Sequence, residues 1–95
     1  MYEHLEVYVP SAFTPNGDGR NDVLHIIAPG LKELSYFRVY DRWGQIAFET
    51  KDLLKGWDGR VKGQLPATGV YVWIMRGVNY LGNLVEKRGT VTLIR

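Results

Sequence analysis

The chain has 95 residues and a net charge of +2, and 45% of its residues are hydrophobic. This length fits one domain with a single core, and the scattering of basic residues among acidic ones argues against a nucleic-acid partner. The absence of cysteine excludes disulfides and thiolate-ligated metals, and no apolar run approaches the roughly 20 residues of a membrane-spanning helix.

The first part of the chain contains two predicted strands and a loop between them. Residues 5–9 alternate between apolar and polar side chains, which predicts an edge strand that ends at Pro10. Residues 13–22 are rich in glycine, asparagine and aspartate, so we expect a loop shaped by side-chain hydrogen bonds to the backbone. A buried strand is predicted for residues 22–27, and residues 31–34 have room for one helical turn.

The middle of the chain predicts a hairpin. Residues 36–43 and 45–49 alternate in polarity, which indicates two antiparallel strands. Residues 42–45 contain a glycine that can supply the positive backbone angle of a tight turn. The alternation places Trp43 on the inner face and Arg42 on the outer face. The outer face is either a plain solvated strand surface, which is the more common case, or a docking patch.

Residues 51–68 hold two turn clusters and few apolar anchors, which indicates a long loop. Trp57 is the exception, and we expect its ring to plug the open end of a sandwich rather than to stack on a ligand. The neighbouring Asp58 would cap the turn through a hydrogen bond to the backbone.

The last third of the chain has the strongest strand signals. Residues 70–78 are apolar at nearly every position on both faces, which predicts a central strand. A turn at residues 79–83 leads to a long strand at residues 84–95, which we expect to be interrupted at Gly89. About seven short strands without helical periodicity predict an all-β fold, an antiparallel immunoglobulin-like or fibronectin-like β-sandwich.

The sequence shows no arrangement typical of an enzyme site. Neither serine, Ser11 or Ser35, lies in a nucleophile motif, and no motif places His4 or His25 as a base. The carboxylates are separated and lie mostly in turns, so spacing defines no acid–base pair. The glycine-rich loop lacks the lysine of a phosphate-binding loop. We therefore predict no catalytic residue and no enzymatic activity.

The same loop has oxygen-bearing side chains that could hold a hard cation. The candidate calcium ligands are Asn16, Asp18 and Asp22. The match to an EF-hand loop is partial, because the twelfth position, where a glutamate belongs, is occupied by His25. In the alternative, the aspartate and asparagine side chains form Asx turns that hold the loop without an ion.

Five segments, taken in order, resemble those of a known family. They are 9–22 (Val-Pro-Ser-Ala-Phe-Thr-Pro-Asn-Gly-Asp-Gly-Arg-Asn-Asp), 37–44 (Phe-Arg-Val-Tyr-Asp-Arg-Trp-Gly), 57–59 (Trp-Asp-Gly), 65–71 (Leu-Pro-Ala-Thr-Gly-Val-Tyr) and 89–95 (Gly-Thr-Val-Thr-Leu-Ile-Arg). Over nearly its whole length the chain is similar to the gliding motility-associated C-terminal domain, the type B C-terminal sorting domain of the type IX secretion system. Trp-Asp-Gly and Gly-Val-Tyr are also similar to signatures of other bacterial immunoglobulin-like modules, so the loop and Asp-Arg-Trp-Gly are the specific part.

The resemblance implies a non-catalytic domain at the C-terminus of large secreted surface proteins, such as gliding adhesins. Such a domain directs its cargo across the outer membrane of a Bacteroidota-type envelope and helps to retain it at the cell surface. The implied partners are the type IX secretion machinery and an outer-membrane protein of the PorP/SprF kind. We expect residues 1–95 to be a single sorting domain excised from a larger protein, monomeric when isolated, with no cofactor unless the loop holds calcium.

Two features could be read by such a partner: the loops at one end of the scaffold and the edge strands of the sheet. We favour the loops, because binding residues concentrate on loops that a rigid scaffold positions. The candidate partner-binding residues are Thr14, Pro15, Asn16, Asp18, Asn21, Asp22, Arg42 and Trp43. The alternative function is an adhesive module that binds calcium or carbohydrate and uses the rings of Tyr36, Tyr40, Trp43 and Trp57.

Overall fold

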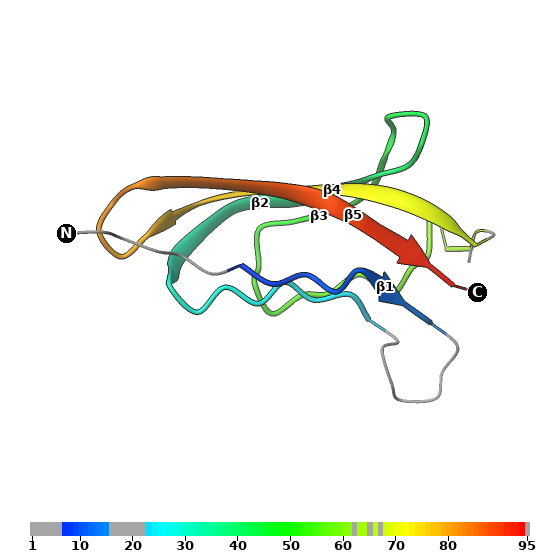
Figure 1. Cartoon of the computed structure of the whole chain (residues 1–95), viewed down its shortest axis with the longest axis horizontal. Helices are drawn as coiled ribbons and strands as arrows, with labels where there is room; N and C mark the ends of the chain where they lie inside the picture. The colour runs from blue at the N-terminus through cyan, green and yellow to red at the C-terminus, as the bar shows by residue number, and fades with distance from the viewer. Residues whose placement is uncertain (1–6, 16–22, 62, 65, 67, 95) are drawn as a thin grey trace.

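A computed structural model describes residues 7–15, 23–61, 63, 64, 66 and 68–94. Within these residues the protein is all-β, with five strands in one open sheet and no helix (Figure 1). The strands are β1 (Ala12–Phe13), β2 (Leu31–Tyr40), β3 (Ile46–Thr50), β4 (Gly69–Asn79) and β5 (Leu84–Leu93). Their order across the sheet is β1-β5-β4-β2-β3, and all neighbours are antiparallel except β1 and β5.

β4 is the middle strand of the sheet, as its apolar composition predicted. It pairs from Gly69 to Val78 with β5 on one side and from Val72 to Asn79 with β2 on the other. Only one of its faces is covered: Tyr71, Trp73 and Met75 are buried, whereas Val70 is 57% exposed. The apolar residues on the other face therefore form an uncovered surface.

The predicted helical turn at residues 31–34 is wrong, because these residues begin β2. Leu31 and Leu34 are both buried, and a spacing of three residues normally indicates a helix. Here the register of β2 against β4 shifts between Leu31 and Glu33 and again between Leu34 and Tyr36. These bulges turn both leucines toward the core within a strand.

The predicted interruption of the last strand at Gly89 is also wrong. Gly89 pairs in register with Trp73, and β5 continues without a shift to Leu93. A Cβ atom at position 89 would lie 2.9 Å from the Trp73 ring, so the glycine makes room for that ring. Val91 and Leu93 in this strand are fully buried.

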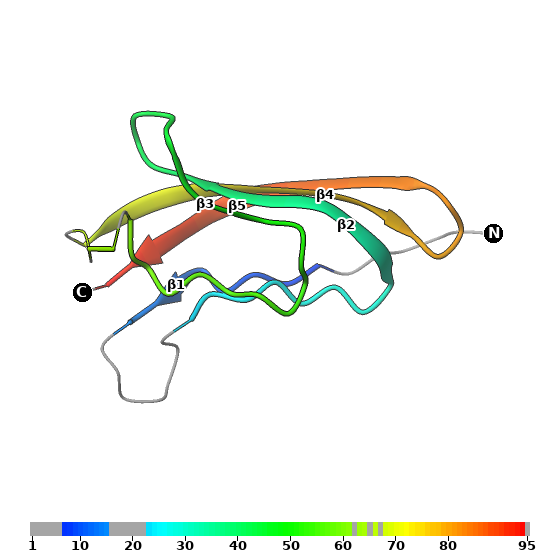
Figure 2. The ribbon, with the colours of Figure 1, turned by 180° about the vertical axis from the view of Figure 1, so that it is seen from behind.

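The second layer consists of extended segments rather than strands, which Figures 1 and 2 show below the inner face of the sheet. Two isolated bridges join these segments, between Tyr8 and Ile27 and between Leu24 and Trp57. The strands predicted at residues 5–9 and 22–27 are therefore absent from the described part of these ranges. Residues 5, 6 and 22 lie outside the described residues. The predicted sandwich of seven strands is not confirmed.

The burial pattern nevertheless explains why the second-layer segments look like strands in the sequence. Leu24, Ile26 and Ala28 are buried, and the residues between them are exposed. The segment thus alternates like a half-buried strand. Proline nearby withholds a backbone donor, and the segment makes single bridges instead of a ladder.

The core lies between these two layers and is rich in aromatic rings. Trp57 is 1% exposed, and its ring centroid lies 5.4 Å from that of Phe13, 6.3 Å from that of Phe48 and 5.1 Å from that of Tyr71. The indole N–H donates to the carbonyl oxygen of Arg60 at 3.0 Å, so the buried polar atom is satisfied. Among the described residues, none lies in a helix long and apolar enough to cross a membrane.

Candidate functional site at the loop end of the sheet

The described candidate residues lie at one end of the sheet, called here the loop end. β1, β2 and β5 run in the same direction, and β4 runs in the opposite one. The C-terminal ends of β1, β2 and β5 and the start of β4 therefore lie at this end, on the right in Figure 1. The loop end consists of Thr14, Pro15, residues 41–45, Thr68 and Ile94.

The structure brings Thr14 and Pro15 to the same end as Arg42 and Trp43, but not into one pocket. The first pair follows β1 at one edge of the sheet, and the second pair lies between β2 and β3 at the other edge. β1 and β2 are three strand positions apart, or about 14 Å at the usual spacing of about 4.8 Å. The other predicted partner-binding residues, Asn16, Asp18, Asn21 and Asp22, lie outside the described residues, and so does the predicted calcium site.

The hairpin turn that carries Arg42 and Trp43 is closed by Asp41. Asp41 and Gln45 form the last backbone hydrogen bond, with the Asp41 N–H donating to the Gln45 carbonyl oxygen at 2.9 Å. The Asp41 Oδ1 atom accepts hydrogen bonds from the N–H groups of Trp43, at 2.8 Å, and Gln45, at 2.9 Å. Gly44 has a φ of 82°, the conformation expected at the last position of a three-residue hairpin loop.

The turn is thus one residue earlier than predicted: it spans residues 41–44, and the Gly44 N–H donates to the Asp41 carbonyl oxygen at 3.0 Å. This shift changes the position of Trp43. The sequence alternation placed the ring on the inner face, but Trp43 belongs to the turn and is 77% exposed. Strand alternation stops where the turn begins, so it no longer determines which way this side chain points.

Arg42 and Trp43 contact each other on the surface of the turn. The guanidinium carbon of Arg42 lies 5.4 Å from the centroid of the Trp43 ring, within the range of a cation–π contact. Among the described residues, Arg42 forms no ion pair with a carboxylate. Its N–H groups therefore have no acidic partner within this part of the chain.

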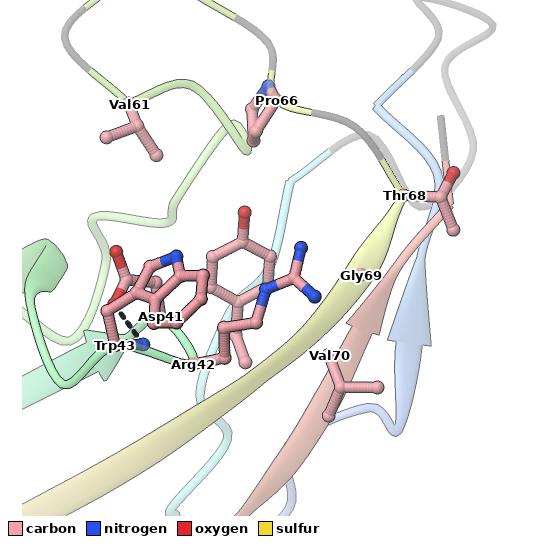
Figure 3. A pocket seen from close by; sticks show the side chains of 9 residues that line it. Asp41, Arg42, Trp43, Val61, Pro66, Thr68, Gly69 and Val70 are labelled. Atoms are coloured by element: carbon pink, nitrogen blue, oxygen red, sulfur yellow. Dashed lines mark hydrogen bonds between the residues drawn. The ribbon is translucent and has the colours of Figure 1, made fainter.

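A cavity of about 530 Å³ lies beside this turn. Its walls come from three places: the hairpin turn, the long loop before β4, and the start of β4 (Figure 3). Figure 3 shows Asp41, Arg42 and Trp43 on one side of the cavity and Val61 and Pro66 on another, with Thr68 just before β4 and Gly69 and Val70 at its start. The cavity therefore combines an arginine, an indole ring and an apolar wall.

Tyr71 also lines the cavity and connects it to the core. Its ring packs edge to face against Trp57, with a centroid separation of 5.1 Å. Burial raises the pKa of the Tyr71 phenol, the Asp41 carboxylate raises it further, and Arg42 lowers it. The buried Trp57 therefore supports the floor of a surface cavity, and the predicted structural role of Trp57 is confirmed.

The predicted cap by Asp58 is confirmed as well. The Arg60 N–H donates to the Asp58 Oδ1 atom at 2.9 Å, which holds the turn that follows Trp57. This turn brings the chain back toward the loop end, where Val61 and Pro66 line the cavity.

The sequence did not predict that Tyr71, Asp41 and Pro66 belong to one site. Tyr71 and Asp41 come together because Tyr40 pairs with Val72 across the sheet. A pairing between strands far apart in the sequence has no local signal. Each residue does stand in a motif that was singled out: Asp-Arg-Trp-Gly, Leu-Pro-Ala-Thr-Gly and Gly-Val-Tyr.

The described residues hold no cluster of metal-ligating side chains. No cluster of three or more histidine, aspartate or glutamate residues that could hold an ion occurs in the part of the chain that the structure covers. His25 is exposed on the outer side of the second layer, near Gly56. No carboxylate of these residues forms an ion pair with His25.

Residues 7–93 match the CHU_C type IX secretion signal domain family. No curated protein matches the chain significantly. Because the family match covers nearly all of the sequence, the chain belongs to the CHU_C type IX secretion signal domain family.

Family membership defines the class of the domain. It is a secretion signal, and the protein that carries it is exported across the outer membrane by the type IX pathway. The domain interacts with the type IX secretion machinery, and the family is not an enzyme family. The type IX part of the resemblance inferred from the motifs is thus confirmed.

Proposed function

We propose that the domain is a C-terminal sorting signal that directs a larger cargo protein, such as a gliding adhesin, to the surface of a Bacteroidota-type cell. The observation that supports this most is the family match over residues 7–93. We further propose that these 95 residues form a single domain that is monomeric when isolated.

The surface that we propose for recognition is the loop end. It combines one end of the five-stranded sheet with the loops that join its strands there, and binding residues concentrate on loops of this kind. We propose as its partner an outer-membrane protein of the PorP/SprF kind. The contact residues would be Thr14, Pro15, Asn16, Asp18, Asn21, Asp22, Arg42 and Trp43.

A reporter fusion tests the sorting function. An unrelated periplasmic reporter would be fused ahead of Met1 and expressed in a bacterium that has the type IX secretion system. We expect the reporter outside the outer membrane, in a surface-bound fraction. The same reporter without the domain should stay in the periplasm, and a fusion that stays there as well would overturn the proposal.

The role of the acidic loop is tested by paired substitutions. The double variant Asp18→Ala and Asp22→Ala removes two carboxylates, and we expect surface display of the fused reporter to be lost while the domain still folds. The matched variant Asp18→Asn and Asp22→Asn removes the charges but retains side chains that can form Asx turns. Normal display by the alanine variant would exclude these side chains from recognition.

Calcium binding by Asn16, Asp18 and Asp22 stays a prediction from the sequence. An ion bound only to the folded state raises the midpoint of thermal unfolding. The measurement is the unfolding midpoint with calcium and with a chelator, and an equal midpoint under both conditions would contradict the prediction.

An adhesive module that binds carbohydrate is the second candidate, and the arrangement of its rings gives it less support. Trp57 is buried in the core, and Tyr36 is covered by Arg38, whose guanidinium carbon lies 4.0 Å from the ring centroid. Trp43 lies in the hairpin turn, beyond the end of β2. The four aromatic residues therefore do not form one platform on which a sugar could stack.

A further inference from the structure

Arg42 differs from most other arginines of the described chain in what it contacts. Arg38 forms an ion pair with Glu49. The Arg76 Nε atom lies 3.6 Å from the Glu86 Oε2 atom on the neighbouring strand. The Arg60 Nε atom lies 3.9 Å from the Asp58 Oδ2 atom. Arg42 instead lies over the Trp43 ring and has no carboxylate partner among the described residues.

This arrangement leaves the hydrogen-bonding edge of the guanidinium open. A guanidinium that contacts an aromatic face keeps its planar N–H groups available, and these match the two oxygens of a carboxylate. The contact with the indole ring also restricts the arginine side chain before a ligand binds, which lowers the entropy cost of binding. Arg42 is therefore placed to bind a carboxylate at the mouth of the cavity by donating hydrogen bonds to it.

Among the described residues, the one acidic side chain in the lining of this cavity is Asp41, and it is already engaged. Its Oδ1 atom accepts two backbone hydrogen bonds, from Trp43 and from Gln45. Those two donors offset part of its negative charge locally. Asp41 thus acts mainly on the turn and does not pair with Arg42 in the described structure.

Next to Arg42 the surface is apolar. Val61 and Pro66 line the cavity, and Val70 continues it onto the outer face of the sheet. Val72 of β4 and Ile46 of β3 are 40% and 51% exposed, and both pair with Tyr40 of β2, which lies between them on the same face. An exposed apolar surface beside one charged group is typical of a site that binds an extended protein segment.

We propose that the cavity at the loop end binds an extended segment of a protein partner, with a carboxylate of that segment on Arg42 and an adjacent apolar side chain between Trp43 and Pro66. The inference rests on the proposed function, because it names the chemistry by which the secretion machinery would recognise this domain. A protein segment fits better than a neutral sugar, because it can supply both a carboxylate for Arg42 and an apolar side chain for the wall formed by Val61, Pro66 and Val70.

The first experiment measures binding directly on the isolated chain. Two capped peptides, acetyl-Gly-Asp-Leu-Gly-amide and its Asn counterpart, are titrated while NMR follows the Arg42 Nε–H and the Trp43 indole N–H. We expect the Asp peptide to shift both signals and to bind about tenfold more tightly than the Asn peptide, since one charge-assisted pair distinguishes them. The preference should disappear in Arg42→Gln.

Arg88→Gln is the matched control, because Arg88 also lacks an ion pair among the described residues but lies on β5, away from the cavity. It should keep the preference for the Asp peptide. Equal binding of the two peptides, no shift with either, or shifts with glucuronate but not with the peptides would overturn the inference.

The second experiment separates this inference from the proposed function. The reporter fusion is compared for the unaltered domain, Arg42→Gln and Arg88→Gln, after circular dichroism has shown that both variants fold. We expect surface reporter to fall about tenfold for Arg42→Gln only. Normal export of that variant contradicts the role of Arg42 and leaves the sorting function intact, whereas failure of the unaltered domain contradicts the sorting function itself.

Discussion

Two hairpins of this domain have the same kind of turn. The side chain of an aspartate accepts the hydrogen bonds that close one turn, and the side chain of an asparagine accepts those that close the other. Asn79 Oδ1 accepts hydrogen bonds from the N–H groups of Leu81 and Asn83, in the pattern that Asp41 shows in its own turn. The glycines of the two turns have φ angles of 82° and 85°. The turn therefore needs an acceptor oxygen at its first position and a glycine at its fourth, and the two residues between them are free for recognition.

At the residue scale, this similarity predicts how position 41 responds to substitution. Asp41→Asn should leave stability within about 0.5 kcal/mol, because the amide oxygen can accept the same two hydrogen bonds. Asp41→Ala removes both acceptor bonds and should cost about 1 kcal/mol in this exposed turn. Urea unfolding of the three proteins measures this, and equal losses for Asn and Ala would show that the charge rather than the acceptor matters.

The Tyr71 phenol gives a pH dependence with a definite sign. Burial is the largest cause of its raised pKa, so the folded protein holds this proton more tightly than the unfolded chain, whose tyrosine pKa is about 10. The stabilisation is complete below pH about 10 and is lost as the pH rises through the higher pKa of the folded state. The stability of Tyr71→Phe should depend less on pH above about 10, as urea unfolding at several pH values would show.

At the scale of elements, a long loop contributes a large aromatic ring to the core. Trp57 lies in a segment that forms no strand, yet its ring is packed among Phe13, Phe48 and Tyr71. These contacts come from β1, β3 and β4, so one loop residue joins three strands of the sheet. The second layer is thus held to the sheet mainly by side-chain packing.

Trp57→Ala should therefore cost about 3–5 kcal/mol of unfolding free energy, the usual range for a buried large aromatic residue. Leu54→Ala in the same loop is the control, because Leu54 is 87% exposed and its loss should cost less than about 0.5 kcal/mol. Urea unfolding measures both, with Trp57→Phe as a milder variant should the alanine protein not fold. A loss below about 1 kcal/mol for Trp57→Ala would contradict the account of the core.

The sequence predicted those elements whose signals are local. The hairpin of β2 and β3 and the hairpin of β4 and β5 follow from alternation interrupted by a glycine-containing turn. β1 was missed, because it has two residues and pairs in parallel with the far end of the chain. The two leucines at the start of β2 suggested a helical turn, since the bulges that bring both to the core arise only when β2 pairs with β4.

At the scale of the whole molecule, the two ends of the sheet differ. The end with the Asn79 turn presents Tyr80 and Leu81, and the loop end presents Arg42 and Trp43 beside a cavity. Part of the loop end was predictable, because Asp-Arg-Trp-Gly is a specific motif. The cavity was not, because its walls come from segments that only the folded sheet brings together.

The similarity of the two turns allows a direct test of whether the loop end is the recognised surface. The triple substitution Asp41→Asn, Arg42→Tyr and Trp43→Leu gives the first turn the sequence of the second and preserves its acceptor oxygen and its glycine. The reverse substitution, Asn79→Asp, Tyr80→Arg and Leu81→Trp, is the control at the opposite end. Both variants should fold, since each keeps the turn that its hairpin needs.

The decisive measurement is the fraction of a fused reporter that reaches the cell surface for each of these two variants. Our account predicts that the substitution at residues 41–43 reduces this fraction about tenfold or more, and that the substitution at residues 79–81 leaves it unchanged. Surface display that is normal after the first substitution, with the domain folded, would contradict recognition through the loop end.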